Sequence, residues 1–338
     1  MTPLFYNQSH STVQSEESHM IRSTLIEEPI RLVGFGPALS LQKIDTVVST
    51  LSQYSKTALD VHYYQPLPSM APAVVIGDLN HSEVLTPQLA PQFKQALAEL
   101  AEGLDIELVV VQNPPTIEQP GVLLMDMDST AIQIECIDEI AVLVGVGEAV
   151  AAVTRRAMAG ELDFAESLIN RVATLTGADE SILAQVADNM PLMPGVETLI
   201  NHLKSKNWVV GIASGGFTYF TDKLKERLGL TATFANQLEI IDGKLTGKVL
   251  GDIVDAKTKA DAVEQMATEY GIEKSQTVAI GDGGNDLLML GKAALGVAFH
   301  AKPLVRQQAQ AAVSKGGLEQ LLYLLLPKEL PKEMAKND

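Results

Sequence analysis

Four short, continuous apolar runs in the last two thirds of the chain constrain its fold more than any other feature. Each is far shorter than a membrane span and has no alternating polar side. Such runs are typical of strands that are buried on both faces of a parallel sheet. Amphipathic segments separate them, which predicts a doubly wound α/β fold. The runs are GVLLM (121–125), NWVVGIA (207–213), QTVAIG (276–281) and LGVAF (295–299).

Two insertions interrupt this α/β pattern. Residues from about 135 to 195 follow the first run as successive helix-like stretches with no central strand, which predicts an inserted helical cap. The segment NQLEIIDGKLTGKVL (236–250) predicts a β-hairpin on an Asp-Gly turn. Because both insertions lie at the rim of the predicted sheet, we expect them to cover its active edge.

The first third of the chain has a different pattern. Strand-like and helix-like blocks between residues 29 and 114 alternate in the order βαββαβ, which predicts an α+β, ferredoxin-like domain. The proline-rich stretch NPPTIEQPG (113–121) then predicts a linker. We therefore divide the chain into a polar tail (1–28), this domain (29–114) and the α/β domain (115–338). The element order resembles the ACT regulatory fold, and the resemblance implies amino-acid binding or homodimer formation.

Charge and composition exclude several classes of partner. The formal net charge is −17, from 42 acidic and 25 basic side chains, so nucleic acid and anionic membranes are not expected to bind. The polar start of the chain lacks the pattern of a signal peptide. Cys136 is the only cysteine, which excludes an intramolecular disulfide and fits a reducing compartment. We expect a soluble, cytoplasmic protein.

Polar residues follow three of the apolar runs, at the sheet edge where α/β proteins bind ligands. In DMDST, two carboxylates two residues apart point the same way if the chain stays extended, although acidic residues there can also simply cap a helix. SGG offers a hydroxyl and backbone N–H groups to a phosphate. GDGGND offers carboxylates to Mg²⁺, or is only a tight polar turn. The residues concerned are Asp126, Asp128, Ser214, Gly215, Asp282, Asn285 and Asp286.

A site for a phosphate also needs a cation, since carboxylates alone repel it. Lys257 and Lys259 both lie at the start of a predicted helix, before the GDGGND strand. Spacing does not separate them, and either could belong to a solvated face.

These four segments, in this order, resemble the motifs of the haloacid dehalogenase-like phosphohydrolases, and Lys259 is the lysine that the resemblance aligns. The stretch from about 121 to 326 resembles the phosphoserine phosphatases of that superfamily most closely. Gly284 departs from the pattern, which more often has alanine there.

The resemblance implies that Asp126 attacks phosphorus and forms an aspartyl-phosphate. Asp128 then acts as general acid and base. It also implies that Mg²⁺ is held by Asp126, the Asp128 carbonyl and Asp282, with Asp286 and Asn285 in support. The phosphoryl group would be bound by Ser214, Gly215, Lys259 and Asn285.

Substrate choice is expected to reside in the cap, since relatives share the core chemistry. By resemblance, Glu135 pairs with the ammonium of phosphoserine and Arg171 with its carboxylate, while Met158 and Phe164 cover the pocket. Taken singly, Arg171 could be a surface charge and Phe164 a core residue. Another phosphatase or phosphotransferase of small metabolites remains an alternative function, and a non-catalytic amino-acid sensor ranks lower because Asp126 and Asp128 are both present.

Overall fold

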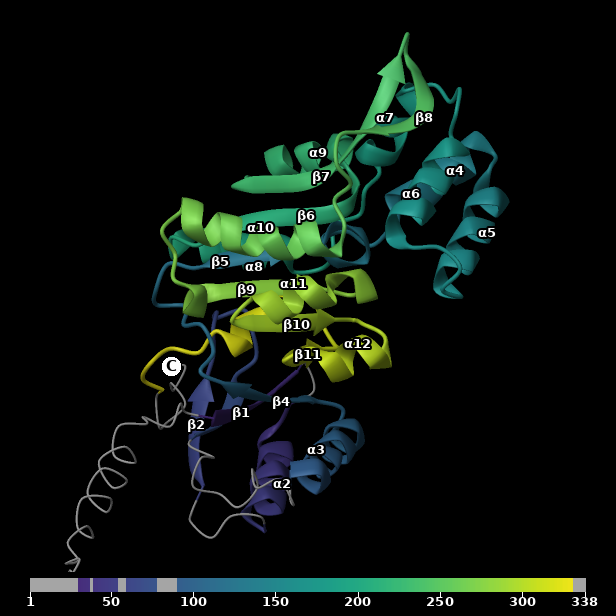
Figure 1. The fold of residues 1–338 in the computed structure, drawn as a ribbon. Helices are drawn as coiled ribbons and strands as arrows, with labels where there is room; N and C mark the ends of the chain where they lie inside the picture. Colours follow the sequence, from purple (N-terminus) through teal and green to yellow (C-terminus); the bar gives the residue numbers. More distant parts are fainter. Residues whose placement is uncertain (1–29, 37–38, 54–58, 78–89, 331–338) are drawn as a thin grey trace, which may run out of the picture.

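The computed structural model describes residues 30–36, 39–53, 59–77 and 90–330, which form two packed units (Figure 1). The predicted polar tail, 1–28, lies outside the described residues. No helix in the described ranges is both long and apolar enough to cross a bilayer.

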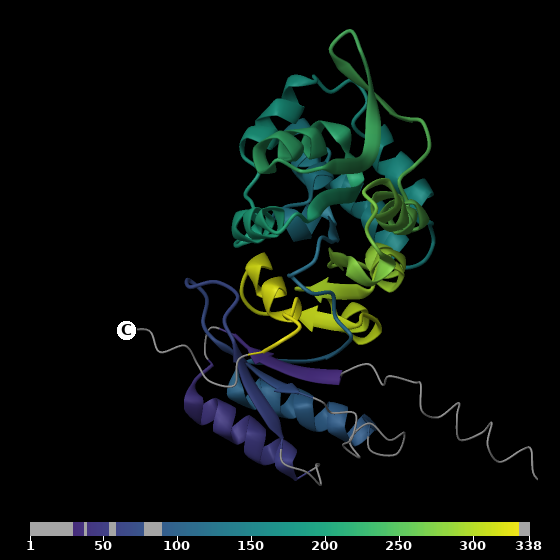
Figure 2. The ribbon, with the colours of Figure 1, turned by 90° about the vertical axis from the view of Figure 1, so that its left-hand side faces the viewer.

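The N-terminal unit is a four-stranded antiparallel sheet in the order β2-β3-β1-β4, with helices α2 and α3 on one face (Figure 2). The predicted βαββαβ order is confirmed. The elements are β1 (Ile30–Phe35), α2 (Leu41–Ser52), β2 (Asp60–Tyr64), β3 (Ala73–Gly77), α3 (Ala90–Leu104) and β4 (Glu107–Gln112).

Both faces of this small sheet are buried. Alternate residues of a strand point to opposite faces, so Leu32 and Ile76 pack among the helices while Val33 and Phe35 join the core of the second unit. The ring of Phe35 stacks on that of Tyr323, with centroids 4.9 Å apart. The Tyr323 hydroxyl donates to the Ala71 carbonyl at 2.6 Å. The two units therefore share one apolar core.

The predicted linker is held in place along part of its length. The Thr116 amide donates to the side-chain oxygen of Gln276, and the Gln276 amide returns a bond to the Thr116 carbonyl. Ile117 is 7% exposed and belongs to the shared core. The proline-rich segment is thus a fixed connection between the units, because a side chain of the second unit satisfies its backbone.

The second unit has a seven-stranded sheet in the order β11-β10-β9-β5-β6-β7-β8, parallel except for the last pair. The doubly wound fold is confirmed, because helices pack on both faces of the sheet. The strands are β5 (Val122–Met125), β6 (Val209–Phe217), β7 (Ala232–Ile241), β8 (Lys244–Leu250), β9 (Thr277–Gly281), β10 (Leu295–Phe299) and β11 (Ala311–Val313). The helices are α8 (Val196–Ser205), α9 (Thr218–Leu228), α10 (Ala256–Glu269), α11 (Leu287–Lys292) and α12 (Pro303–Gln308).

A helical insertion follows β5 and lies beyond the strand ends, beside the tip of the β7–β8 hairpin (Figure 1). Asp242 and Gly243 both have positive φ at that tip, as a tight Asp-Gly hairpin turn requires. The Leu245 amide donates to Ala178, and the Gly177 amide donates back to Leu245. The hairpin therefore supports the cap. Its helices are α4 (Cys136–Val144), α5 (Gly147–Met158), α6 (Phe164–Ala173) and α7 (Ser181–Asp188).

Candidate active site

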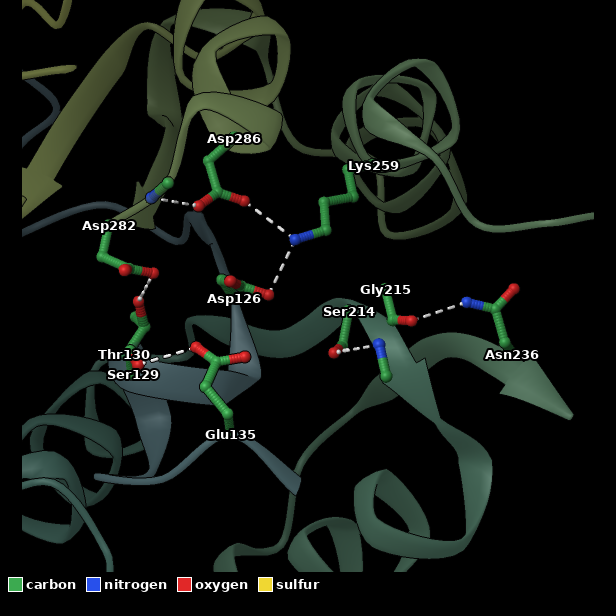
Figure 3. A network of polar contacts seen from close by, with 12 residues as sticks. Asp126, Ser129, Thr130, Glu135, Ser214, Gly215, Asn236, Lys259, Asp282 and Asp286 are labelled. Atoms are coloured by element: carbon green, nitrogen blue, oxygen red, sulfur yellow. Dashed lines mark hydrogen bonds and ion pairs between the residues drawn. The ribbon is translucent and has the colours of Figure 1, made fainter. Parts of the chain in front are cut away.

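The segments that follow β5 and β9 meet the last residues of β6 and the first turn of α10 at one edge of the sheet (Figure 3). Asp126, Ser214, Lys259 and Asp286 are all buried there, with at most 6% of each residue exposed. Burial of this many polar groups is costly unless they pair with one another or with a ligand. These buried charged and polar side chains therefore favour binding of a charged ligand at this edge of the sheet.

Lys259 is the cation at the centre of the cluster. Its Nζ donates to Asp126 Oδ1 at 2.7 Å and to Asp286 Oδ1 at 2.8 Å. Burial favours loss of its proton, but attraction to both carboxylates outweighs this and raises the pKa of Lys259. Lys257, by contrast, has a side chain that is 78% exposed and pairs with Asp261 on the helix surface. The structure therefore decides between the two lysines.

Three carboxylates could hold a metal ion. Donor atoms of Asp126, Asp282 and Asp286 lie within 4.8 Å of one another. With Lys259 in its charged form, the three carboxylates leave a formal charge of −3 + 1 = −2 if all are ionised. Burial, followed by repulsion from Asp286, raises the pKa of Asp126 and raises that of Asp282 to about 6. Oxygen donors with excess negative charge fit a hard divalent cation.

Asp128 has a different environment from that cluster. Its Oδ1 accepts a 3.0 Å bond from the amide of Cys136, the first residue of α4. Burial and the nearby charge of Glu135 raise the pKa of Asp128 to about 7. A carboxyl group that titrates near neutral pH is suited to give and take a proton. Asp128 therefore also has the alternative role offered by the sequence, since its carboxylate accepts from an amide at the start of helix α4.

Ser214 and Gly215 form the candidate phosphate seat at the end of β6. The Ser214 Oγ accepts from the Gly216 amide at 2.8 Å and remains able to donate its own hydrogen. The ring of Phe164, at the start of α6, rests against Gly215, where an added Cβ would lie 2.5 Å from the ring. Glycine is therefore needed at 215, and the Phe164 ring lies against the candidate seat, while its role as cover of a substrate pocket stays a prediction.

The other three predicted cap residues differ in how close to the cluster they lie. Glu135 accepts a 2.9 Å bond from the Ser129 hydroxyl at the edge of the cluster. Burial lowers the pKa of Arg171, against the attraction of Asp138, Glu135 and Asp128. The Arg171 Nε is buried and has no hydrogen-bond partner in the described ranges, so a donor is left for a ligand. Met158 is 70% exposed at the end of α5, and its role as cover stays a prediction.

Two residues of the site were missed from the sequence. The Thr130 hydroxyl donates to Asp282 at 3.3 Å and helps to orient that carboxylate. Asn236 is 1% exposed and donates to the Gly215 carbonyl at 2.9 Å. An amide side chain among apolar residues in FANQL was the one available signal. Asn285 lies close over Gly283, and its contact with a phosphoryl group stays a prediction.

The family model for haloacid dehalogenase-like hydrolases matches residues 120–294, a stretch that contains every residue of this cluster. The chain belongs to the haloacid dehalogenase-like hydrolases. The chain is also similar to the phosphoserine phosphatase of Vibrio cholerae, to which it is 53% identical over 226 residues. That alignment covers 67% of this chain and 69% of the Vibrio protein.

Solved structures described as phosphoserine phosphatases have a similar fold. A probable phosphoserine phosphatase from Vibrio cholerae, in an unliganded form, has a TM-score of 0.72 at 42% identity and covers 87% of this chain and 86% of its own. A phosphoserine phosphatase described as a phospho-aspartyl intermediate analogue has a TM-score of 0.57 at 40% identity, over 60% of this chain and 98% of its own. The structural likeness thus includes the hydrolase domain and, for the first of these, extends well beyond it.

Proposed function

We infer that the protein is a phosphoserine phosphatase, which hydrolyses O-phosphoserine to serine and phosphate in the last step of serine biosynthesis. The observation that carries this is the pairing of Asp126 with Lys259 at the strand end (Figure 3), close to Glu135 and Arg171, two cap residues of opposite charge. Relatives named as phosphoserine phosphatases, at 53% and 52% identity, support the same substrate. Acyl-phosphate chemistry on an aspartate suits this arrangement.

In the proposed reaction, an oxygen of Asp126 attacks phosphorus and the bond from phosphorus to the serine oxygen breaks. Asp128 gives its proton to the departing serine oxygen, which its pKa of about 7 allows at neutral pH. Asp128 then takes a proton from the water that attacks the aspartyl-phosphate, so that phosphate leaves and Asp126 is restored. The acid and the base are the same group in successive steps.

The charges around the phosphoryl group are proposed to be shared among several residues. Lys259 offsets the negative charge of the phosphoryl oxygens, and Ser214, Gly215 and Asn285 bind these oxygens. Asp126, Asp282 and Asp286, with the carbonyl of Asp128, would hold Mg²⁺, which supplies electrostatic stabilisation of the transferring group. One oxygen atom from each of these three side chains already lies within 4.8 Å of the other two.

The cap is proposed to read the amino-acid part of the substrate. The free Nε of Arg171 can bind the carboxylate of phosphoserine, since a guanidinium offers paired donors. Glu135 binds its ammonium group, while Phe164 and Met158 cover the pocket. Phosphatases for other small metabolites share the core but have no need of this pair of opposite charges.

Compartment and assembly complete the proposal. The buried free thiol of Cys136 supports a reducing cytoplasm. A homodimer would form through the N-terminal unit, where no strand lies beyond β2 among the residues that the structure describes. The sheet face opposite α2 and α3 packs against the second unit. The edge of β2 and the two helices are therefore left for contacts with a second copy.

Phosphate release from phosphoserine, with and without Mg²⁺, tests the activity directly. Asp126→Asn should abolish turnover, because the amide is a far weaker nucleophile; normal turnover by this variant would refute the mechanism. Arg171→Ala should lose activity on phosphoserine but much less on phosphoethanolamine, which has no carboxylate. Equal losses on the two substrates would refute the binding of the carboxylate by Arg171. Assays on a panel of sugar phosphates would detect the alternative function, a phosphatase of other small metabolites.

A further inference from the structure

The candidate phosphate seat is an irregularity in the pairing of β6 with β7. Ala213 pairs with Phe234, and the next pair is Phe217 with Asn236. Between these pairs β6 advances four residues and β7 only two (217 − 213 = 4; 236 − 234 = 2). Residues 214–216 therefore bulge out of the ladder, and extra residues in a bulge lose regular backbone partners.

Asn236 supplies a partner that the ladder cannot. It stands where the regular pairing resumes, and its Nδ2 donates to the Gly215 carbonyl at 2.9 Å. A bond to this carbonyl fixes the orientation of the following peptide, whose Gly216 amide bonds to the Ser214 Oγ. The side chain thus sets the shape of the bulge, without itself lying among the candidate phosphate ligands (Figure 3).

The other end of the same amide holds a second part of the site. The amide of Val254 donates to Asn236 Oδ1 at 2.8 Å. The next residue, Asp255, caps α10 by accepting from the Thr258 amide, and Lys259 lies in the first turn of that helix. One buried side chain is therefore bonded both to the Ser214–Gly215 bulge and to the segment that delivers Lys259.

We propose that Asn236 is a positioning residue for phosphoryl transfer, which keeps the Ser214–Gly215 bulge and Lys259 in register with each other around the phosphoryl group. This rests on the proposed function only in that the site binds a phosphoryl group, and it does not depend on which phosphate ester is the substrate. Small displacements of groups that bind a transferring phosphoryl group are costly, because catalysis there is largely positioning and electrostatics.

Two variants separate positioning from simple structural support. Asn236→Ala removes both bonds. Asn236→Asp keeps the size and the acceptor for Val254, but it replaces the donor that faces Gly215 by a second acceptor. Gln237→Ala is the matched control, because Gln237 is the exposed neighbour in the same strand. The assay compares kcat and KM for p-nitrophenyl phosphate and phosphoserine, the inhibition constant of orthophosphate, and the melting temperature.

We expect both Asn236 variants to raise KM and the orthophosphate inhibition constant about tenfold or more and to lower kcat, as displaced binding groups do. A loss of folded protein alone would lower kcat and the melting temperature but leave KM and the inhibition constant unchanged. Constants within twofold of wild type for the soluble Asn236→Asp protein would overturn the proposal. If wild type hydrolyses p-nitrophenyl phosphate but not phosphoserine, the substrate assignment fails while the Asn236 comparison still stands.

Discussion

Replacement of Lys259 by methionine removes the buried cation and keeps most of the side-chain volume. Its Nζ contacts two carboxylates whose side chains are 8% and 0% exposed, so Asp126 and Asp286 would lose their partner in a buried position. Removal of one partner of a buried ion pair costs about 3–5 kcal/mol. At an unfolding entropy of about 2.1 cal/mol/K per residue, we expect the melting temperature of this 338-residue protein without metal to fall by roughly 4–7 °C. Loss of one group that stabilises the transferring charge should lower kcat by about 10²–10³-fold.

Lys257→Met is the control for this change, since it deletes the same chemical group two residues away on the helix surface. Its exposed pair with Asp261 should contribute about 0–1 kcal/mol, and the variant should keep wild-type activity. Differential scanning fluorimetry with and without Mg²⁺ adds a second comparison. Without Lys259 the three carboxylates carry −3 instead of −2, so Mg²⁺ should raise the melting temperature of Lys259→Met by more than that of wild type.

Three results would refute this reasoning. One is a Lys259→Met protein as stable without metal as Lys257→Met. A second is a smaller stabilisation by Mg²⁺ in Lys259→Met than in wild type. The last is retention of more than a tenth of the wild-type kcat, which would place the needed positive charge elsewhere in the site.

Two further predictions concern the contact between the units. The Oε1 of Glu107 accepts a bond from the Ser314 amide at 2.7 Å, and burial raises the pKa of this carboxyl group. Its ionised form therefore lowers the stability of the fold above the folded-state pKa. This cost disappears as the pH falls and the group is protonated. Glu107→Gln keeps an acceptor and should raise the melting temperature at pH 8 but not at pH 4; a constant difference across that range would contradict it. Phe35→Ala should destabilise by about 3–5 kcal/mol, because the ring is fully buried. Trp208, the only tryptophan, is buried in the second unit. Its fluorescence in a denaturant titration should therefore show the lower stability of Phe35→Ala. An unfolding transition equal to that of wild type would mean that the units unfold independently.

The regular elements could be predicted from the sequence because each repeats a local pattern. The strand IRLVGF has the same bounds, Ile30–Phe35, in the pattern and in the structure. The three-residue strand β11 was missed, since AAV has too few residues to show any period. The β7 strand begins four residues before the predicted hairpin, because its first residues pair with β6 as part of the main sheet.

The site was predictable as far as strand ends could be recognised. Carboxylates after β5 and β9 meet because adjacent parallel strands end at the same edge, so Asp126 and Asp282 could be paired from the sequence. The sequence pattern could not show whether Lys257 or Lys259 is the cation of the site. Residues two apart on a helix face different sides, and which side is buried depends on packing. The role of Asn236 depends on a bulge, which is a property of two strands together.

The shared core has a practical consequence for work with the isolated hydrolase domain. A protein cut near residue 115 would expose the apolar residues that now meet Val33 and Phe35, including the Tyr323 ring. Large exposed apolar patches promote aggregation. A shortened form of this chain should therefore need polar replacements on that surface before it can be purified and crystallised.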